Sequence, residues 1–95
     1  MKNYVPLSSL AMDLKRAALG WQRNSAKLAG RFYLESLKRK REIDTRSIPP
    51  YIVNLLSEVE QLEKIKDNLE KGEKALLLST LFQNAAVTLS KISKD

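Results

Sequence analysis

Apolar residues recur every three or four positions through three stretches of this chain, a spacing typical of amphipathic α-helices. The first stretch runs from about residue 8 to residue 43, the second from about residue 50 to residue 71, and the third from about residue 73 to residue 92. Pro50 favours a helix start at the second stretch, because proline suits the first helical position. The pattern therefore predicts an all-α fold built from three helices.

Gly72 separates the second stretch from the third. Glycine readily takes the left-handed conformation that ends many helices. In addition, the apolar face of the third stretch points about 150° away from that of the second, so one straight helix would turn its two halves towards opposite sides. We therefore expect a turn at Gly72, and an up-down-up three-helix bundle with a long first helix.

The length of the first predicted helix creates a packing problem. At 1.5 Å per residue it would be about 54 Å long, whereas the other two would reach only about 30 Å and leave its N-terminal half uncovered. Leaving large apolar side chains in water costs on the order of 1.5 to 3 kcal/mol each. Five such side chains lie in this half: Leu10, Met12, Leu14, Leu19 and Trp21.

Two arrangements would cover these five side chains. A second copy of the chain can pack on them, and a homodimer is the commonest symmetric assembly. Alternatively, the first helix breaks at Gly20 and its first half folds back over the bundle. On a straight helix Gly20 and Gly30 both project towards the polar side, where close packing gives no reason for a glycine. We therefore predict a homodimer that uses these five residues.

The positive charge is concentrated in the first predicted helix. The net charge is +6, and the first 44 residues hold ten Lys or Arg against four Asp or Glu. Such a helix can bind an acidic protein partner or, through phosphates, a nucleic acid without sequence preference. The simpler alternative is a solvated helix face, with the last-turn cations favoured by the helix dipole. The cations on the side of this helix opposite its large apolar residues form the predicted basic face: Arg16, Arg23, Lys27, Arg31, Lys38 and Arg41.

The residue types that are missing limit the chemistry. The sequence has no cysteine and no histidine, which excludes disulfides, thiolate metal sites and the usual general base near neutral pH. Its three glycines are isolated, so no phosphate-cradling loop is expected. We therefore predict a protein that is not an enzyme and has no metal site and no cofactor.

No apolar run reaches the roughly 20 residues that span a bilayer, and the first residues lack the apolar core of a signal peptide. A cytoplasmic location without membrane association is expected. The sequence thus predicts a small helical protein–protein interaction or regulatory module that acts as a homodimer. The alternative is a weak, sequence-nonspecific nucleic-acid-binding protein that uses the basic face of the first helix.

Overall fold

The computed structural model describes residues 3–92 and is all-helical over that range. Its four α-helices are α1 (Tyr4–Gln22), α2 (Ala26–Arg41), α3 (Pro50–Gln61) and α4 (Asn68–Ile92), joined in part by 3-10 turns at Thr45–Ser47 and Leu62–Lys64. The molecule is elongated, with extents of 44 × 19 × 18 Å. The all-α prediction is confirmed, but the described residues form four α-helices where three were predicted.

Asn24 ends the first part of the helix that was predicted over residues 8–43. Its φ of 56° lies in the left-handed region, which asparagine tolerates better than most residues with a side chain. The backbone N–H of Asn24 donates to the Trp21 carbonyl at 3.1 Å, and that of Ser25 donates to the Gly20 carbonyl at 2.8 Å. The two bonds form a Schellman motif. The prediction of one long helix is therefore wrong, and the alternative of a folded-back first half is the observed one.

Gly20 does not break the helix but lies where α1 and α2 pack closely together. A Cβ added to Gly20 would lie 2.8 Å from the backbone nitrogen of Ala29 and 2.9 Å from its Cα, which is too close for any side chain. Placing Gly20 on the polar side was wrong, because α2 folds back onto that side of α1. Around Gly30 the space is open, and nothing in the structure explains that glycine.

The predicted turn at Gly72 is also misplaced, because α4 continues through this residue. The chain turns earlier, and α4 follows Asp67, whose side-chain Oδ2 accepts a hydrogen bond from the backbone N–H of Glu70 at 2.9 Å. This is a helix N-cap. A Cβ on Gly72 would lie 3.0 Å from the Ala18 carbonyl oxygen and 2.8 Å from Cγ of Gln22. The absence of a side chain at Gly72 therefore allows α4 to pack closely against α1.

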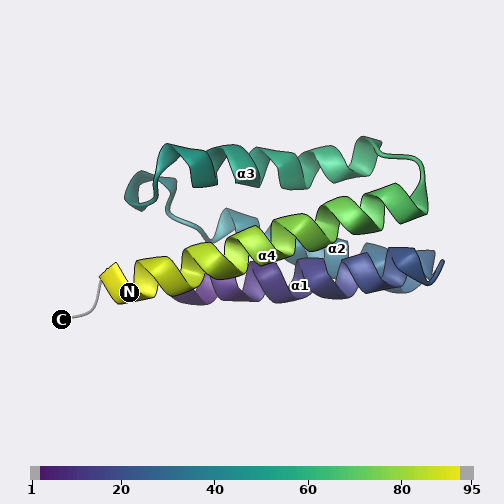
Figure 1. The fold of residues 1–95 in the computed structure, drawn as a ribbon, viewed down its shortest axis with the longest axis horizontal. Helices are drawn as coiled ribbons and strands as arrows, with labels where there is room; N and C mark the ends of the chain where they lie inside the picture. The colour runs from purple at the N-terminus through teal and green to yellow at the C-terminus, as the bar shows by residue number, and fades with distance from the viewer. Residues whose placement is uncertain (1–2, 93–95) are drawn as a thin grey trace.

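The helices α2 and α4 both pack against α1, and α3 lies on α4 and α2 as an outer layer, on the side away from α1 (Figure 1). The start of α3 at Pro50 agrees with the sequence prediction, and Pro49 before it is extended. The hydroxyl of Tyr33 on α2 donates to the Val59 carbonyl of α3 at 2.9 Å. The largest fully buried apolar side chains are Leu7, Leu10, Leu14, Ile52, Val59, Leu62, Leu78 and Phe82.

The folded-back arrangement removes the packing problem posed by the sequence. The helix α1 has 19 residues and α4 has 25, so α4 can cover the full length of α1. Leu10, Leu14 and Trp21, three of the five side chains assigned to a dimer interface, are buried within their own chain. The expectation that all five need a second copy is therefore wrong.

Asn3 ties the start of α1 to the connection after α2. Its Nδ2 donates to the Asp44 carbonyl at 3.0 Å, and its Oδ1 accepts from the Asp44 backbone N–H at 2.9 Å. The Asn3 side chain is almost fully buried, so these bonds satisfy polar groups that water cannot reach. The contact fixes the end of α1 that is distant from the Asn24 turn.

Candidate interaction surfaces

The helix break divides the predicted basic face. Lys27, Arg31, Lys38 and Arg41 stay together on the solvent side of α2, and all four are exposed. Leu34 lies between them at the same helical phase, and its side chain is 61% exposed. We name these five residues the α2 outer face; at 1.5 Å per residue it extends over about 21 Å.

Arg16 and Arg23 do not continue this surface, because they belong to α1 and to the turn after it. The guanidinium of Arg16 lies 5.6 Å from the centre of the Phe32 ring and 3.8 Å from Asp13. Arg16 is therefore engaged within the chain. The structure does not bring the six predicted cations into one row along a helix, and only four of them share a face of α2.

The four consecutive cations at the end of α2 divide between the core side and the solvent side. Lys40 forms an ion pair of 2.8 Å with Glu60 of α3, and Arg39 lies 3.3 Å from Glu42. Lys38 points to the α2 outer face, and Arg41 lies at the edge of that face, where the hydrogen bond from Lys40 and, to a smaller extent, the charge of Arg41 lower the pKa of Glu60 on α3. The cations of the last turn thus serve two purposes, and the sequence could not separate them because consecutive residues fan out around a helix.

The cations of the α2 outer face are largely uncompensated. Lys38 lies 3.3 Å from the carboxylate of Glu35 on the same helix, in an exposed contact. Lys27, Arg31 and Arg41 form no ion pair with any of the described residues 3–92. Because exposed helix-surface pairs contribute little, the face remains positively charged and open to an acidic partner.

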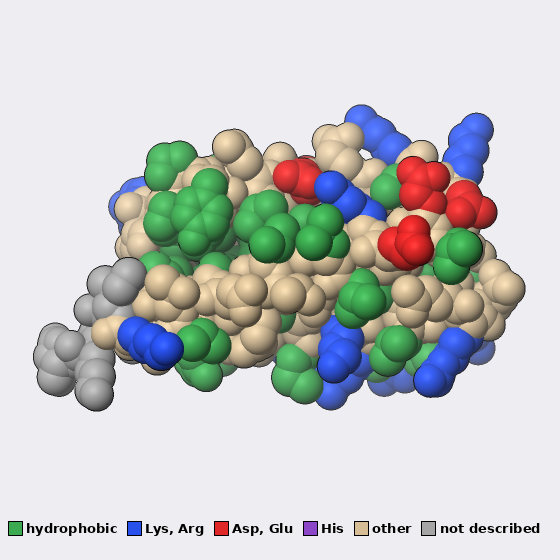
Figure 2. Space-filling view, viewed as in Figure 1, with side chains coloured by type: hydrophobic (Ala, Val, Ile, Leu, Met, Phe, Trp, Pro, Cys, Tyr) green, Lys and Arg blue, Asp and Glu red, His purple; other side chains and the backbone are tan. Residues whose placement is uncertain are grey.

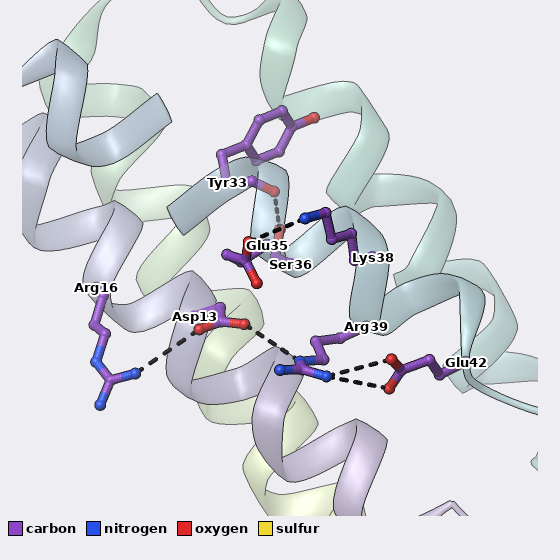
Figure 3. Close-up of polar contacts among 8 residues, drawn as sticks. All are labelled: Asp13, Arg16, Tyr33, Glu35, Ser36, Lys38, Arg39 and Glu42. Atoms are coloured by element: carbon purple, nitrogen blue, oxygen red, sulfur yellow. Dashed lines mark hydrogen bonds and ion pairs between the residues drawn. The ribbon is translucent and has the colours of Figure 1, made fainter. Parts of the chain in front are cut away.

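Asp13 is the one strongly buried carboxylate among the described residues, with 8% of its surface exposed. Figure 3 shows it between two cations, Arg16 on its own helix at 3.8 Å and Arg39 of α2 at 3.9 Å. Burial raises the pKa of Asp13 above its ordinary value, and the charges of Arg39 and Arg16 oppose this effect only in part. The cluster joins α1 to α2. It could not be predicted from the sequence, because Asp13 and Arg39 come together only when α2 folds back along α1.

Tyr33 is buried against Trp21, with ring centres 5.7 Å apart. Burial, helped by the charges of Glu63 and Glu60, raises the pKa of the Tyr33 hydroxyl to about 12. The phenol therefore stays protonated at neutral pH and donates its hydrogen bond to α3. This residue acts as a core residue with its hydroxyl at the edge.

The two other residues of the predicted dimer interface, Met12 and Leu19, lie on the surface of α1, with exposed fractions of 50% and 37%. Val5 precedes them on the same side and is 65% exposed. Their spacing of seven residues keeps the three side chains within about 40° of one another. Val5 was not among the predicted interface residues because the predicted helix began at residue 8, although the seven-residue spacing is visible in the sequence.

The side of α4 next to α1 carries exposed apolar side chains too, among polar residues such as Ser79, Gln83 and Asn84. A groove of about 390 Å³ between the two helices is lined by Met12 and Lys15 from α1 and by Leu76, Thr80 and other residues of α4. Leu69 and Val87 are exposed at nearly the same helical phase as Leu76. We name the surface formed by Val5, Met12, Leu19, Leu69, Leu76 and Val87 the α1–α4 face.

A further set of hydrophobic side chains follows the seam between α3 and α4, and acidic side chains gather near the connection between these helices (Figure 2). The exposed apolar residues there include Tyr51, Leu77 and Leu81. An ion pair of 2.7 Å between Lys74 and Glu58 crosses the same seam. This region therefore holds α3 on the bundle.

Within residues 3–92 no group of three or more carboxylates is placed to hold a metal ion. None of the described helices is both long enough and apolar enough to cross a membrane. No protein-family model, curated protein or solved structure matches this chain.

Proposed function

We propose that this protein is a non-enzymatic helical interaction module that binds an acidic surface of another protein through the α2 outer face. The observation that carries the proposal is the set of four exposed cations around the exposed Leu34, of which only Lys38 forms an ion pair within residues 3–92. Opposite charges on the partner would steer the encounter, and an apolar side chain on the partner would cover Leu34.

The composition of the α2 outer face favours a protein over a nucleic acid. Single-stranded nucleic acids are held by aromatic side chains on which bases stack, interleaved with cations. On α2 the aromatic residues are Phe32 and Tyr33, and both turn towards the core side. The centre of the face is Leu34, which offers nothing to a phosphate. The nucleic-acid alternative is thus restricted to four phosphate contacts.

Two fluorescent probes separate these functions: a synthetic amphipathic peptide that alternates Glu with Leu along one helical side, and a single-stranded DNA of 30 bases. We expect the peptide to bind the wild-type chain, and the double variant Arg31→Glu/Lys38→Glu to lose at least about tenfold in affinity. The matched control is Lys66→Glu/Lys91→Glu, which changes the net charge equally at exposed sites outside this face.

The variant Leu34→Ser distinguishes binding of an acidic protein from binding of a nucleic acid. It should weaken peptide binding but leave DNA binding unchanged, because serine keeps all four cations. DNA held through four phosphates should lose about 50-fold in affinity between 50 and 200 mM salt. Tighter binding of DNA than of peptide, with no effect of Leu34→Ser, would establish the nucleic-acid alternative. A chain that binds neither probe at 50 mM salt would refute both.

A further inference from the structure

We infer that the α1–α4 face binds a second copy of this chain, with the two α1 helices antiparallel and Met12 on the two-fold axis. This surface is separate from the α2 outer face, so the inference does not depend on the function proposed above. It rests on the positions of the exposed apolar side chains, on the charges beside them and on the area available.

Apart from Tyr4, the exposed large apolar side chains of α1 are arranged symmetrically about Met12. Val5 precedes Met12 by seven residues and Leu19 follows it by seven. A two-fold interface must be self-complementary: if one residue contacts a second residue of the other copy, that second residue also contacts the first across the axis. Antiparallel pairing about Met12 meets this condition: Met12 lies opposite Met12, and Val5 lies opposite Leu19.

The charged residues of α1 favour the antiparallel orientation over the parallel one. In the antiparallel pairing Lys15 and Arg16 lie opposite the other copy's Ser9 and Ser8, so no like charges meet. Parallel helices would instead place each cation against its own equivalent, which is destabilising. Lys15 is the one charged side chain that lines the groove between α1 and α4. The middle of the face is therefore available to apolar contact.

The groove gives the second copy a place to insert. Met12 lies at its edge on α1, and Leu76, Ser79 and Thr80 line its α4 side. Because the two-fold axis passes near Met12, each copy would bring its Met12 side chain to the other's groove, next to Leu76. Methionine suits this role because its unbranched side chain adapts to an irregular surface.

The area is sufficient for a dimer of modest affinity. A two-helix face about 28 Å long and about 20 Å wide offers about 560 Å² per copy. The total of about 1,100 Å² lies near the lower limit of specific interfaces. We therefore expect dissociation constants in the micromolar range and a monomer that stays folded, in contrast to the obligatory dimer that the sequence predicted.

The first experiment measures molar mass by light scattering from about 1 to 300 μM, the concentration range that matches a weak interface. The wild-type chain should pass from monomer to dimer. Met12→Glu should raise the dissociation constant at least about tenfold, whereas the matched control Leu34→Glu, on α2 and outside the α1–α4 face, should leave it unchanged. A monomer throughout the range would overturn the inference, and so would a dimer lost in Leu77→Glu but kept in Met12→Glu.

The second experiment tests the register and does not depend on a destabilising variant. Because the chain has no cysteine, single cysteines report directly on proximity. Met12→Cys should form a disulfide-linked dimer under mild oxidation. Val5→Cys and Leu19→Cys should cross-link when mixed but not each with itself, since equivalent positions would lie about 21 Å apart, well beyond the roughly 7 Å limit between Cα atoms. Efficient self-linking of Val5→Cys would overturn the antiparallel arrangement.

Discussion

At the scale of single residues, Gly20 and Gly72 both allow another helix to approach the backbone. Each would place a Cβ within 3.0 Å of an atom on a neighbouring helix. Sequence alone presents these residues as helix breakers, because glycine lowers helix stability by about 1 kcal/mol relative to alanine. Their role becomes visible only when the helices are placed side by side.

Gly20→Ala should therefore destabilise the protein by about 1 to 3 kcal/mol, because the new methyl group meets the backbone of Ala29 and forces α1 and α2 apart. Gly30→Ala is the matched control. It should stabilise the protein by about 0.5 to 1 kcal/mol, because the space around it is open and alanine is the better helix former. Urea unfolding of both variants checks the pair; equal effects of the same sign would contradict the close contact.

Asp13 should make the stability depend on pH. Because burial raises its folded-state pKa, the folded protein binds a proton more readily than the unfolded chain. The free energy of unfolding should therefore rise as the pH falls through the raised pKa towards the ordinary value of 3.8. Asp13→Asn removes this contribution, so wild type should gain stability relative to the variant on acidification.

Chemical unfolding of wild type and Asp13→Asn at several pH values between about 7 and 4 measures this difference. Glu60, whose pKa is lowered chiefly by its hydrogen bond with Lys40, acts in the opposite direction but is present in both proteins. A stability difference that stays constant over the range would contradict a raised pKa for Asp13. A wild type that loses stability relative to Asp13→Asn on acidification would show that the Arg39 and Arg16 charges dominate.

At the scale of helices, the turn between α1 and α2 depends on one residue with a positive φ. Asn24→Ala should lower the free energy of unfolding by about 1 to 2 kcal/mol, because alanine is strained in the left-handed conformation. Asn24→Gly should match or exceed the wild-type stability, since glycine adopts this conformation without strain. Thermal unfolding followed by circular dichroism checks the expected order of stability, with glycine at or above asparagine and alanine lowest. An alanine variant as stable as wild type would show that the left-handed residue of the Schellman motif does not determine the stability of the protein.

The sequence allowed prediction of the helical class, the start of α3 and most apolar positions, because all of these follow from periodicity and proline chemistry. It did not allow prediction of the α1–α2 turn. Asn24 continues a helical pattern whose apolar residues keep their spacing on both sides, and Gly20 nearby is the stronger breaker by propensity. The buried Asp13 and its two arginines follow from this turn and were missed for the same reason.

At the scale of the whole molecule, α3 should be the least protected of the helices. It covers the bundle from one side, and its polar links to the rest are few: Tyr33 to Val59, Lys40 to Glu60 and Lys74 to Glu58. Local opening of such an element costs less than global unfolding. Hydrogen exchange should show faster exchange at buried α3 positions such as Leu56 than at Leu14 of α1; equal rates would indicate one cooperative unit.

The charge and the apolar surface are separated over the molecule. Lys27, Arg31 and Arg41, which form no ion pair within residues 3–92, lie on α2, whereas the exposed apolar residues of the α1–α4 face lie on α1 and α4. Variants on the two faces should therefore have independent effects. Leu34→Ser should impair binding to the acidic peptide and leave self-association intact, and Met12→Glu should do the reverse.

The packing of α1 against α4 has a consequence for synthesis. The Ser79 hydroxyl of α4 donates to the Ala11 carbonyl of α1 at 2.8 Å, across a sequence separation of 68 residues. On the ribosome, α1 emerges well before its main neighbour α4 is available. A nascent chain held before α4 has left the exit tunnel should remain sensitive to protease, and resistance should arise only when α4 is released.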